Sequence, residues 1–371
     1  MIIKLLFYLF IVCTVVQLIY WWGVFFTLAR YKETAENPKK KAEEVSIIIC
    51  ARNEEANLKK NLPLILNQNY RSFEVVVVNH NSTDQSTNVL GEYQGKFPYL
   101  RIVDFHNVNQ FLAGKKKALE QGILTAKNKV LLLTDADCEP SSENWLSQMQ
   151  NKLEGDKEIV LGFSPYRKKK GLLNLFIRYE TIYAAIQYFS FALAKMPYMG
   201  VGRNLAYHKN LFAKANGFKS HEHITSGDDD LFINQVANSN NVAINLNEES
   251  FVLTEPKKTW RSFFRQKARH LTTGTAYKGK HQFFLALLSA THFGHYLLGG
   301  LLLFNSSSAW NAVILFYLVR ITSVFVLQYF LLKKFKEIAM LKWIPFLDAI
   351  FVIYYLVFAP YLFIGNRKTW T

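Results

Sequence analysis

The chain has 371 residues, half of which are hydrophobic, and it carries a formal net charge of +16. This excess of Lys and Arg suits an anionic membrane surface or a phosphate-bearing ligand, and the sequence has no RNA- or DNA-binding signature that would favour nucleic acid. The three cysteines, Cys13, Cys50 and Cys138, are scattered along the chain. Neither a disulfide framework nor a zinc site is therefore predicted, which fits a reducing compartment.

The N-terminal end is strongly apolar. Residues 5–28 contain no charged side chain, and this stretch exceeds the roughly 20 residues that a helix needs to cross a hydrocarbon core. The small-residue cleavage site of a secretory signal is not present after it. We therefore predict a retained transmembrane anchor over residues 1–30.

Three further apolar stretches predict transmembrane helices over residues 282–304, 312–332 and 342–364. Lys and Arg collect on the cytosolic side of membrane helices. If the region between the first and second helices is cytosolic, all the basic flanks fall on that side, and both termini lie outside. These flanks are residues 30–41, 278–280 and 333–336.

Two charged residues, Arg320 and Asp348, lie inside the predicted membrane helices. Both would be costly in contact with lipid, so we expect them to face the interior of the helix bundle. An ion pair between them would hold helices together, and a site for a lipid headgroup is the alternative.

The central region alternates short β-branched runs with segments of helical period between Val45 and Thr134. This pattern predicts an α/β domain over residues 45–280, with a mostly parallel sheet that is buried on both faces. The glycine-rich loops that bind dinucleotides or ATP are absent from the sequence. Ligands of such sheets bind at the carboxyl ends of the strands. Polar residues stand at these ends: Arg52, Asn53 and Glu54 after the first strand, Asn79 to Asp84 after the second, and Asp135 and Asp137 after the fourth.

Two helical segments later in the domain are candidates for contact with the membrane. Residues 171–195 are rich in aromatic side chains, and residues 259–275 form a basic amphipathic pattern. We interpret both as helices at the membrane interface. A buried aromatic helix is the alternative for the first, and Arg269 of the second could face inward to meet phosphate.

The segment TDAD contains Asp135 and Asp137. Residues two apart in an extended segment project to the same side, so both carboxylates can face one ligand. Two such charges repel each other unless a cation lies between them, and Mg²⁺ or Mn²⁺ bridging phosphates is a natural occupant. A solvated turn or a helix cap is the alternative.

A second acidic cluster, Asp228 to Asp230, opens a predicted helix. Acidic residues are stabilised in the first turn of a helix by its dipole, so some of the three are expected to cap the helix. One aspartate directed into a cleft could instead act as a general base.

The ordered motifs CARNEE, NHNSTD, GKKKAL, TDAD, GVGRN, GDDD and QKARH, framed by one membrane helix before and three after, resemble the membrane-bound family-2 glycosyltransferases. Ceramide glucosyltransferase and the poly-N-acetylglucosamine, hyaluronan and cellulose synthases are members. The similarity spans residues 45–275 by motif. It implies a GT-A fold and transfer of a sugar from a nucleotide-sugar donor.

The resemblance also implies roles for individual residues. TDAD matches the metal-binding DxD motif, so Asp137 would hold Mg²⁺ or Mn²⁺ and Asp135 would contact the sugar or nucleotide. GDDD matches an acidic pair in which Asp229 is the base, and a slip of one residue would move this role to Asp228 or Asp230. The remaining donor-binding residues would be Ala51, Arg52, Glu54, Asn79, His80, Lys115, Gln266 and Arg269, and the acceptor-side residues Arg203, Asn204 and His270.

Two departures from the family pattern bear on the substrates. Asn79 and His80 replace an Asp-Asp pair, one member of which reads uracil, so a UDP-linked sugar is expected but the nucleotide stays open. His270 replaces the tryptophan of the QxxRW motif, which weakens the similarity to polymer synthases.

These features together predict an integral membrane enzyme, with its catalytic domain facing the cytoplasm of a bacterial inner membrane or an equivalent membrane. We expect inverting, metal-dependent transfer of one sugar to a membrane lipid. A processive polysaccharide synthase is the first alternative. A non-catalytic receptor or scaffold on a degenerate transferase domain is the second.

Overall fold

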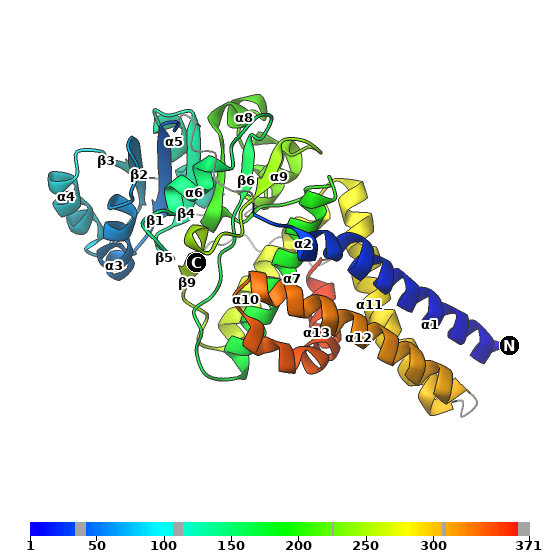
Figure 1. Ribbon diagram of the computed structural model, residues 1–371. Helices are drawn as coiled ribbons and strands as arrows, with labels where there is room; N and C mark the ends of the chain where they lie inside the picture. The colour runs from blue at the N-terminus through cyan, green and yellow to red at the C-terminus, as the bar shows by residue number, and fades with distance from the viewer. Residues whose placement is uncertain (34–41, 107–113, 225, 306–308, 363–371) are drawn as a thin grey trace.

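A computed structural model describes residues 1–33, 42–106, 114–224, 226–305 and 309–362. An α/β domain lies at one end of the molecule and a bundle of apolar helices at the other (Figure 1). The long helix α7, which covers Leu172–Leu193, lies between the two parts.

The α/β domain contains a seven-stranded sheet with the order β3-β2-β1-β4-β7-β6-β8. Its neighbours pair in parallel except at β7, which runs antiparallel to both β4 and β6. This confirms the expected mostly parallel α/β fold. The strands are β1 Val45–Ala51, β2 Phe73–His80, β3 Leu100–Phe105, β4 Val130–Asp135, β6 Ile159–Leu161, β7 Leu205–His208 and β8 Val242–Ile244.

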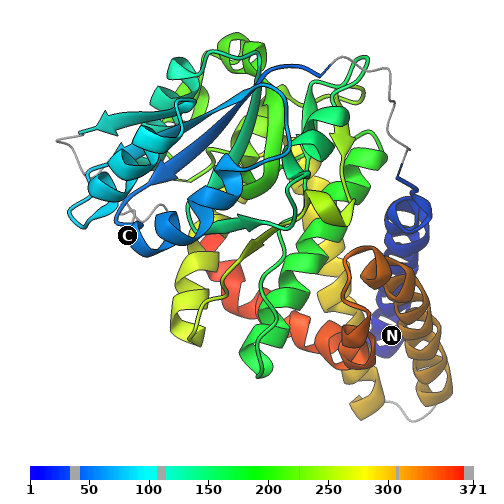
Figure 2. The same ribbon diagram turned by 60° about the vertical axis from the view of Figure 1, so that its left-hand side comes forward.

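The sheet is covered on both faces by helices (Figure 2), which explains why its central strands are apolar along nearly their whole length. Helix α5 packs closely on β1 and β2, because a Cβ atom at Gly122 would lie only 2.8 Å from Ile48 Cγ2 and 2.9 Å from Val78 Cγ2. The helices of the domain are α3 Glu55–Leu66, α4 Ser86–Lys96, α5 Gly114–Thr125, α6 Trp145–Asn151, α8 Lys209–Lys214 and α9 Asp230–Val236.

A small second sheet and several short 3₁₀ helices complete the domain. Strands β5 and β9 pair antiparallel beside the end of β4. Their bounds are Cys138–Pro140 and Val252–Thr254, and the 3₁₀ helices are η2 Gly202–Asn204, η3 Lys219–His221 and η4 Glu248–Ser250.

Helix α7 is largely buried. Of its 22 residues, 13 are buried. The ring of Tyr183 makes edge-to-face contacts with Phe25 and Phe351 of the apolar bundle. This burial agrees with the alternative of a buried aromatic helix, and contact of α7 with the membrane interface stays a prediction. The second candidate segment forms α10 Trp260–Leu271 and the 3₁₀ helix η5 Thr272–Ala276.

Four segments are long and apolar enough to cross a membrane, by length and composition: Ile2–Arg30, Gly279–Asn305, Trp310–Lys334 and Ile338–Phe358. They mark the chain as a membrane protein. The first contains α1 Ile2–Ile19, a π-helical stretch η1 Tyr20–Phe25 and α2 Phe26–Arg30, and the others are α11, α12 and η7 Ile338–Trp343 with α13 Ile344–Phe358. The last two residues of the predicted 342–364 helix lie outside the described residues.

A buried polar network ties the apolar helices together at Arg320 of α12 and Asp348 of α13. Arg320 Nη1 donates to Asp348 Oδ2 at 2.5 Å and Nη2 donates to Oδ1 at 3.3 Å. Tyr296 Oη donates to the same carboxylate at 2.7 Å, and Gln17 Oε1 accepts from Arg320 Nη2 at 3.2 Å. Residues of all four apolar segments thus meet in this Arg320 network, and the predicted ion pair is present.

Replacing Asp348 by Leu is expected to lower the stability of the helix bundle by about 3–5 kcal/mol, because Arg320 would remain buried without its carboxylate. The double change Arg320→Met with Asp348→Leu is expected to recover most of that loss, since it removes both charges. Thermal unfolding in detergent, followed by tryptophan fluorescence, measures both effects. A double variant as unstable as Asp348→Leu would contradict this account.

Candidate active site

A cavity of about 1180 Å³ begins at the carboxyl ends of β1 and β4 and extends to the apolar helices. Its walls come from the α/β domain and from α7, α10, α11 and α13. Most of the predicted site residues line it: Arg52, Glu54, Lys115, Asp135, Asp137, Arg203, Asp228, Asp229, Asp230, Gln266, Arg269 and His270.

The TDAD segment places two carboxylates at this cavity. Strand β4 ends at Asp135, Ala136 and Asp137 form a turn, and β5 begins at Cys138. The segment is therefore a turn, contrary to the extended geometry expected from the sequence. It still brings a ligand atom from each of Asp135, Asp137 and Cys138 within 4.8 Å of one another.

The chemistry of this cluster fits a hard divalent cation. Burial raises the pKa of Asp137, and the nearby charge of Asp135 raises it further. Burial also raises the pKa of Glu54, with a smaller contribution from Asp137. A cation would relieve this repulsion, and carboxylate oxygens are the ligands that Mg²⁺ and Mn²⁺ prefer.

The thiol of Cys138 is a soft ligand, which suits a hard divalent cation poorly. Burial raises the pKa of Cys138 well above its ordinary value, so the thiol stays protonated near neutral pH. Its Sγ donates to Asp137 Oδ1 at 3.4 Å. The thiol therefore orients the carboxylate, and Asp135 and Asp137 are the residues that could hold the ion.

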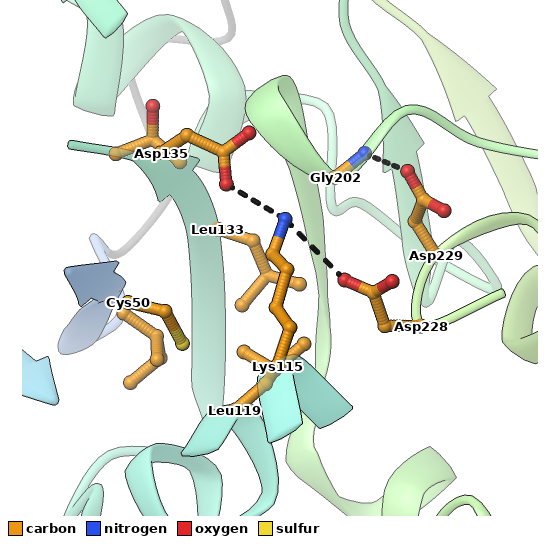
Figure 3. Close-up of a pocket in the computed structure, with 10 residues that line it drawn as sticks. Cys50, Lys115, Leu119, Leu133, Asp135, Gly202, Asp228 and Asp229 are labelled. Carbon is orange, nitrogen blue, oxygen red and sulfur yellow. Dashed lines mark hydrogen bonds and ion pairs between the residues drawn. The ribbon is translucent and has the colours of Figure 1, made fainter. Parts of the chain in front are cut away.

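Lys115, in the first turn of α5, connects the two acidic clusters (Figure 3). Its Nζ lies 3.0 Å from Asp135 Oδ1 and 3.5 Å from Asp228 Oδ2. Burial alone would lower the pKa of Lys115, but these two carboxylates raise it well above its ordinary value. Lys115 is thus a fixed positive charge at the inner end of the cavity.

The three consecutive aspartates have three different environments. Burial alone would raise the pKa of Asp228, but Lys115 holds it below the ordinary value. Asp230 accepts hydrogen bonds from the hydroxyl groups of Thr273 and Tyr277, the latter at 2.8 Å. These contacts give Asp228 an ion-pairing role and Asp230 a structural one.

Asp229 differs from both neighbours. Its Oδ2 accepts from the backbone N–H of Gly202 at 2.6 Å, and its Oδ1 accepts from the N–H of Asp230 at 2.8 Å. Burial raises the pKa of Asp229 to about 7, with the charges of Asp228 and Asp230 contributing. A carboxyl group that titrates near neutral pH is suited to accept a proton from a ligand.

Helix α10 brings a row of polar side chains to the opposite wall. Gln266, Lys267, Arg269 and His270 all line the cavity. The Nε of Arg269 is buried without a hydrogen-bond partner among the described residues. Desolvation lowers the pKa of His270 well below its ordinary value, aided by Lys267 and Arg269, so its ring is neutral.

Arg203 lies on the η2 turn beside the acidic cluster. It stacks on Tyr166, with its guanidinium carbon 5.0 Å from the ring centroid, and donates from Nη1 to Tyr166 Oη at 3.1 Å. Its Nε is also buried without a partner among the described residues. Arg203 and Arg269 both line the cavity and thus place two positive charges beside an anion bound there.

Among the cavity residues that the sequence did not predict are Glu180, Lys267 and Tyr166. Lys267 Nζ pairs with Glu180 Oε2 of α7 at 2.5 Å, and Tyr166 supports Arg203. The acidic residue Glu180 within a segment rich in aromatic residues could have indicated an ion pair, since a buried carboxylate requires a partner. The identity of that partner depends on tertiary packing.

Four predicted site residues do not line the cavity. Ala51 is buried in the core. Asn79 donates from Nδ2 to Thr87 Oγ1 and Asp104 Oδ1, and the ring of His80 packs against Gly114. Residues 107–113 lie outside the described part of the chain. The donor-binding roles of Asn79 and His80 stay predictions.

Asn204 requires a correction. The sequence predicts an acceptor contact, but its side chain is buried and fully hydrogen-bonded within the domain. Its Nδ2 donates to Phe163 O at 2.9 Å and Ser250 O at 2.8 Å, and its Oδ1 accepts from Trp145 Nε1 at 3.0 Å. Asn204 therefore holds the η2 turn in place through hydrogen bonds to the interior of the domain.

Comparison with known families now adds to this geometry. The family model described as glycosyl transferase family group 2 matches residues 147–363, more than half of the chain, and that of glycosyl transferase family 2 matches residues 46–203. The chain is a family 2 glycosyltransferase. The expected membership and enzyme class are thereby confirmed.

Relatives of this glycosyltransferase carry consistent names. The probable glycosyltransferase YdaM of Bacillus subtilis (strain 168) is 26% identical over 241 residues, which cover 62% of this chain and 55% of YdaM. The beta-monoglucosyldiacylglycerol synthase of Nostoc sp. (strain PCC 7120 / SAG 25.82 / UTEX 2576) is 30% identical over 101 residues, 27% of this chain and 21% of the synthase. The glycosyltransferase thus spans about half the length of YdaM and less of the synthase.

A solved structure shares the fold of the glycosyltransferase. The mannosyltransferase PcManGT from Pyrobaculum calidifontis, solved in complex with GDP-Man and Mn²⁺, superposes with a TM-score of 0.59 at 16% identity. The match covers 91% of this chain and 99% of PcManGT. At this identity the similarity establishes the fold alone, and it confirms the GT-A architecture.

Proposed function

We propose that this glycosyltransferase moves a sugar from a nucleoside diphosphate sugar to a membrane lipid, with inversion at the anomeric carbon. The observation that carries the proposal is the continuity of one cavity from Asp137 and Asp229 to apolar side chains of α11 and α13. Among these side chains are Leu285 and Phe358. A lipid acceptor could place its hydroxyl group beside Asp229 while its chain stays in apolar surroundings.

The relatives support this choice of substrates. The name of the Nostoc protein refers to a glucosylated diacylglycerol, and PcManGT was solved with a nucleoside diphosphate sugar and Mn²⁺. A UDP-linked donor stays our expectation from the motifs, although the donor of PcManGT carries guanine. Both donor types share the diphosphate that the cations of the cavity would bind.

The proposed reaction is a direct displacement. Asp229 removes the proton from the acceptor hydroxyl, the hydroxyl oxygen bonds to the anomeric carbon, and the bond from that carbon to the diphosphate oxygen breaks. Arg269 donates to the leaving diphosphate, Arg203 does so in place of the acceptor contact expected from the sequence, and Lys115 adds a third positive charge. Asp135 and Asp137 would hold Mg²⁺ or Mn²⁺, which when bound neutralises charge on the diphosphate.

Lipid analysis tests the proposal. Membranes that contain the protein would be incubated with UDP- and GDP-sugars and Mn²⁺, and their lipids extracted for mass spectrometry. A new lipid heavier by one sugar is expected with the wild type and with Glu222→Gln, a control that neutralises an exposed carboxylate. Polymeric product would instead identify a processive synthase, and donor binding without transfer or hydrolysis would identify a receptor.

We also propose that the α/β domain faces the cytoplasm, because the basic flanks favour that side. Nucleotide sugars are charged and soluble, and a cytoplasmic domain would meet them directly. Protease protection of the domain in right-side-out vesicles, with cleavage in inverted ones, would support this orientation. The opposite pattern would exclude it.

The rate should depend on pH through the general base. Because the pKa of Asp229 is raised to about 7, its reactive carboxylate form predominates only above that value. We expect kcat/KM to rise with pH up to about 7 and then to level off. Initial rates at saturating Mn²⁺ between about pH 5.5 and about pH 8.5 measure the profile. A flat profile over this range would contradict the assignment of Asp229 as a base with this pKa.

A further inference from the structure

The last apolar segment, Ile338–Phe358, is long enough to cross a membrane, yet it begins on the side of the α/β domain. Just before it, Lys334 Nζ donates to the carbonyl of Tyr31. Lys336 Nζ pairs with Glu248 Oε2 of the domain at 2.7 Å. Glu337 forms a bidentate ion pair with Arg178 of α7. These contacts fix the start of the segment against the domain.

The segment also ends on that side. The ring of Phe358 lies 5.5 Å from the ring of Phe264 in α10. The following 3₁₀ helix η8, Ala359–Leu362, packs against η5 and α10. Helix α11 follows η5 in the chain and leads away from the domain (Figure 1). The end of the segment therefore lies at the same end of α11 as Gly279.

Between these ends the segment reaches into the bundle. Asp348 pairs with Arg320, which lies about four helical turns before the end of α12. Helix α13 itself has 15 residues, or about 22 Å, which is shorter than the roughly 30 Å of a hydrocarbon core. In Figures 1 and 2, α13 stays close to α7 and α10, while α1, α11 and α12 extend beyond it.

One side of this segment forms part of the cavity. Phe351, Tyr354, Tyr355 and Phe358 line it together with Asp229 and Arg269. A helix satisfies its backbone hydrogen bonds internally, so α13 needs no partner for them at membrane depth, and α11 and α12 pack against it. The segment thus closes the cavity on the membrane side with aromatic side chains.

We propose that residues 338–358 form a re-entrant segment, which enters and leaves the membrane on the side of the α/β domain and binds the hydrocarbon chain of the acceptor lipid. The end of η8, the last described element, then lies on the side of the catalytic domain and opposite to the N-terminus, whereas the sequence predicts both termini on one side. The topology stands independently of the activity, and the lipid contact rests on the proposed function.

Epitope tags on both ends of the full-length chain test the topology. In sealed vesicles whose orientation exposes the α/β domain to protease, the C-terminal tag should also be removed. In vesicles of the other orientation, protease should remove the N-terminal tag. Removal of both tags from the same side would overturn the proposal. The result does not depend on whether any lipid is glycosylated, so it separates this proposal from the proposed function.

The lipid contact is tested with Phe358→Ala and the milder Phe358→Leu. We expect Phe358→Ala to raise the KM for the acceptor about tenfold, with donor hydrolysis in the absence of acceptor unchanged and Phe358→Leu intermediate. Phe346→Ala is the matched control, because Phe346 is 52% exposed on the same helix and does not line the cavity. An unchanged acceptor KM in both Phe358 variants, or an equal rise in Phe346→Ala, would overturn the role in lipid binding.

Discussion

Asp229→Asn is expected to lower sugar transfer by about 10² to 10⁴-fold, the usual contribution of a general base. The amide keeps the shape of the side chain and an oxygen that can accept from the N–H of Gly202, so the fold and donor binding should persist. It cannot take up the proton of the acceptor hydroxyl. Initial rates of glycolipid formation, together with donor affinity by calorimetry, separate these effects.

The neighbouring aspartates sharpen this test. Asp228→Asn removes a partner of Lys115 and should weaken donor binding. Asp230→Asn loosens the contact with Thr273 and Tyr277 and should act mainly on stability. Suppose that Asp229→Asn kept full activity while Asp228→Asn or Asp230→Asn lost sugar transfer but kept its donor affinity. The residue replaced in that inactive variant would then be the base.

Asp137→Asn is expected to raise the energy barrier to transfer by several kcal/mol and so to lower the transfer rate on the order of 10³-fold. The reason is that the ion that neutralises the diphosphate would no longer be held. For the same reason, EDTA should abolish the activity of the wild type, and Mn²⁺ or Mg²⁺ should restore it. Titration of Mn²⁺ binding by electron paramagnetic resonance provides a readout besides activity.

Cys138→Ala is the matched control for this prediction. The thiol lies in the same cluster, but Mn²⁺ prefers carboxylate oxygens to a thiol, so its removal should leave the Mn²⁺ affinity nearly unchanged. Equal loss of affinity in Cys138→Ala and Asp137→Asn would show that the thiol is a ligand. Full activity of Asp137→Asn in the presence of EDTA would exclude the proposed metal site.

The parts of the site that depend on local pattern were accessible from the sequence. The run Val130 to Thr134 is apolar because β4 is buried within the sheet, and strand ends of parallel sheets bind ligands. The positions of Asp135 and Asp137 follow from these two facts. The order of the motifs then located Asp229 and Arg269, which the fold brings to the same cavity.

Features that depend on packing between distant residues were not accessible. The pairing of Lys267 with Glu180 and the buried hydrogen bonds of Asn204 join segments far apart in the chain. Hydropathy gave the length of the last apolar segment but not the side on which it ends. The turn at Asp137 was only an alternative to the expected extended segment, because a two-residue pattern does not distinguish a turn from a strand.

The anchoring of η2 affects how inactive variants of this protein should be interpreted. The N–H of Gly202 orients Asp229, and two residues later Asn204 ties the same turn to Trp145, Phe163 and Ser250. A variant at Asn204 would displace the base without touching either substrate. Screens that score activity alone would therefore misassign this scaffold position as a substrate contact.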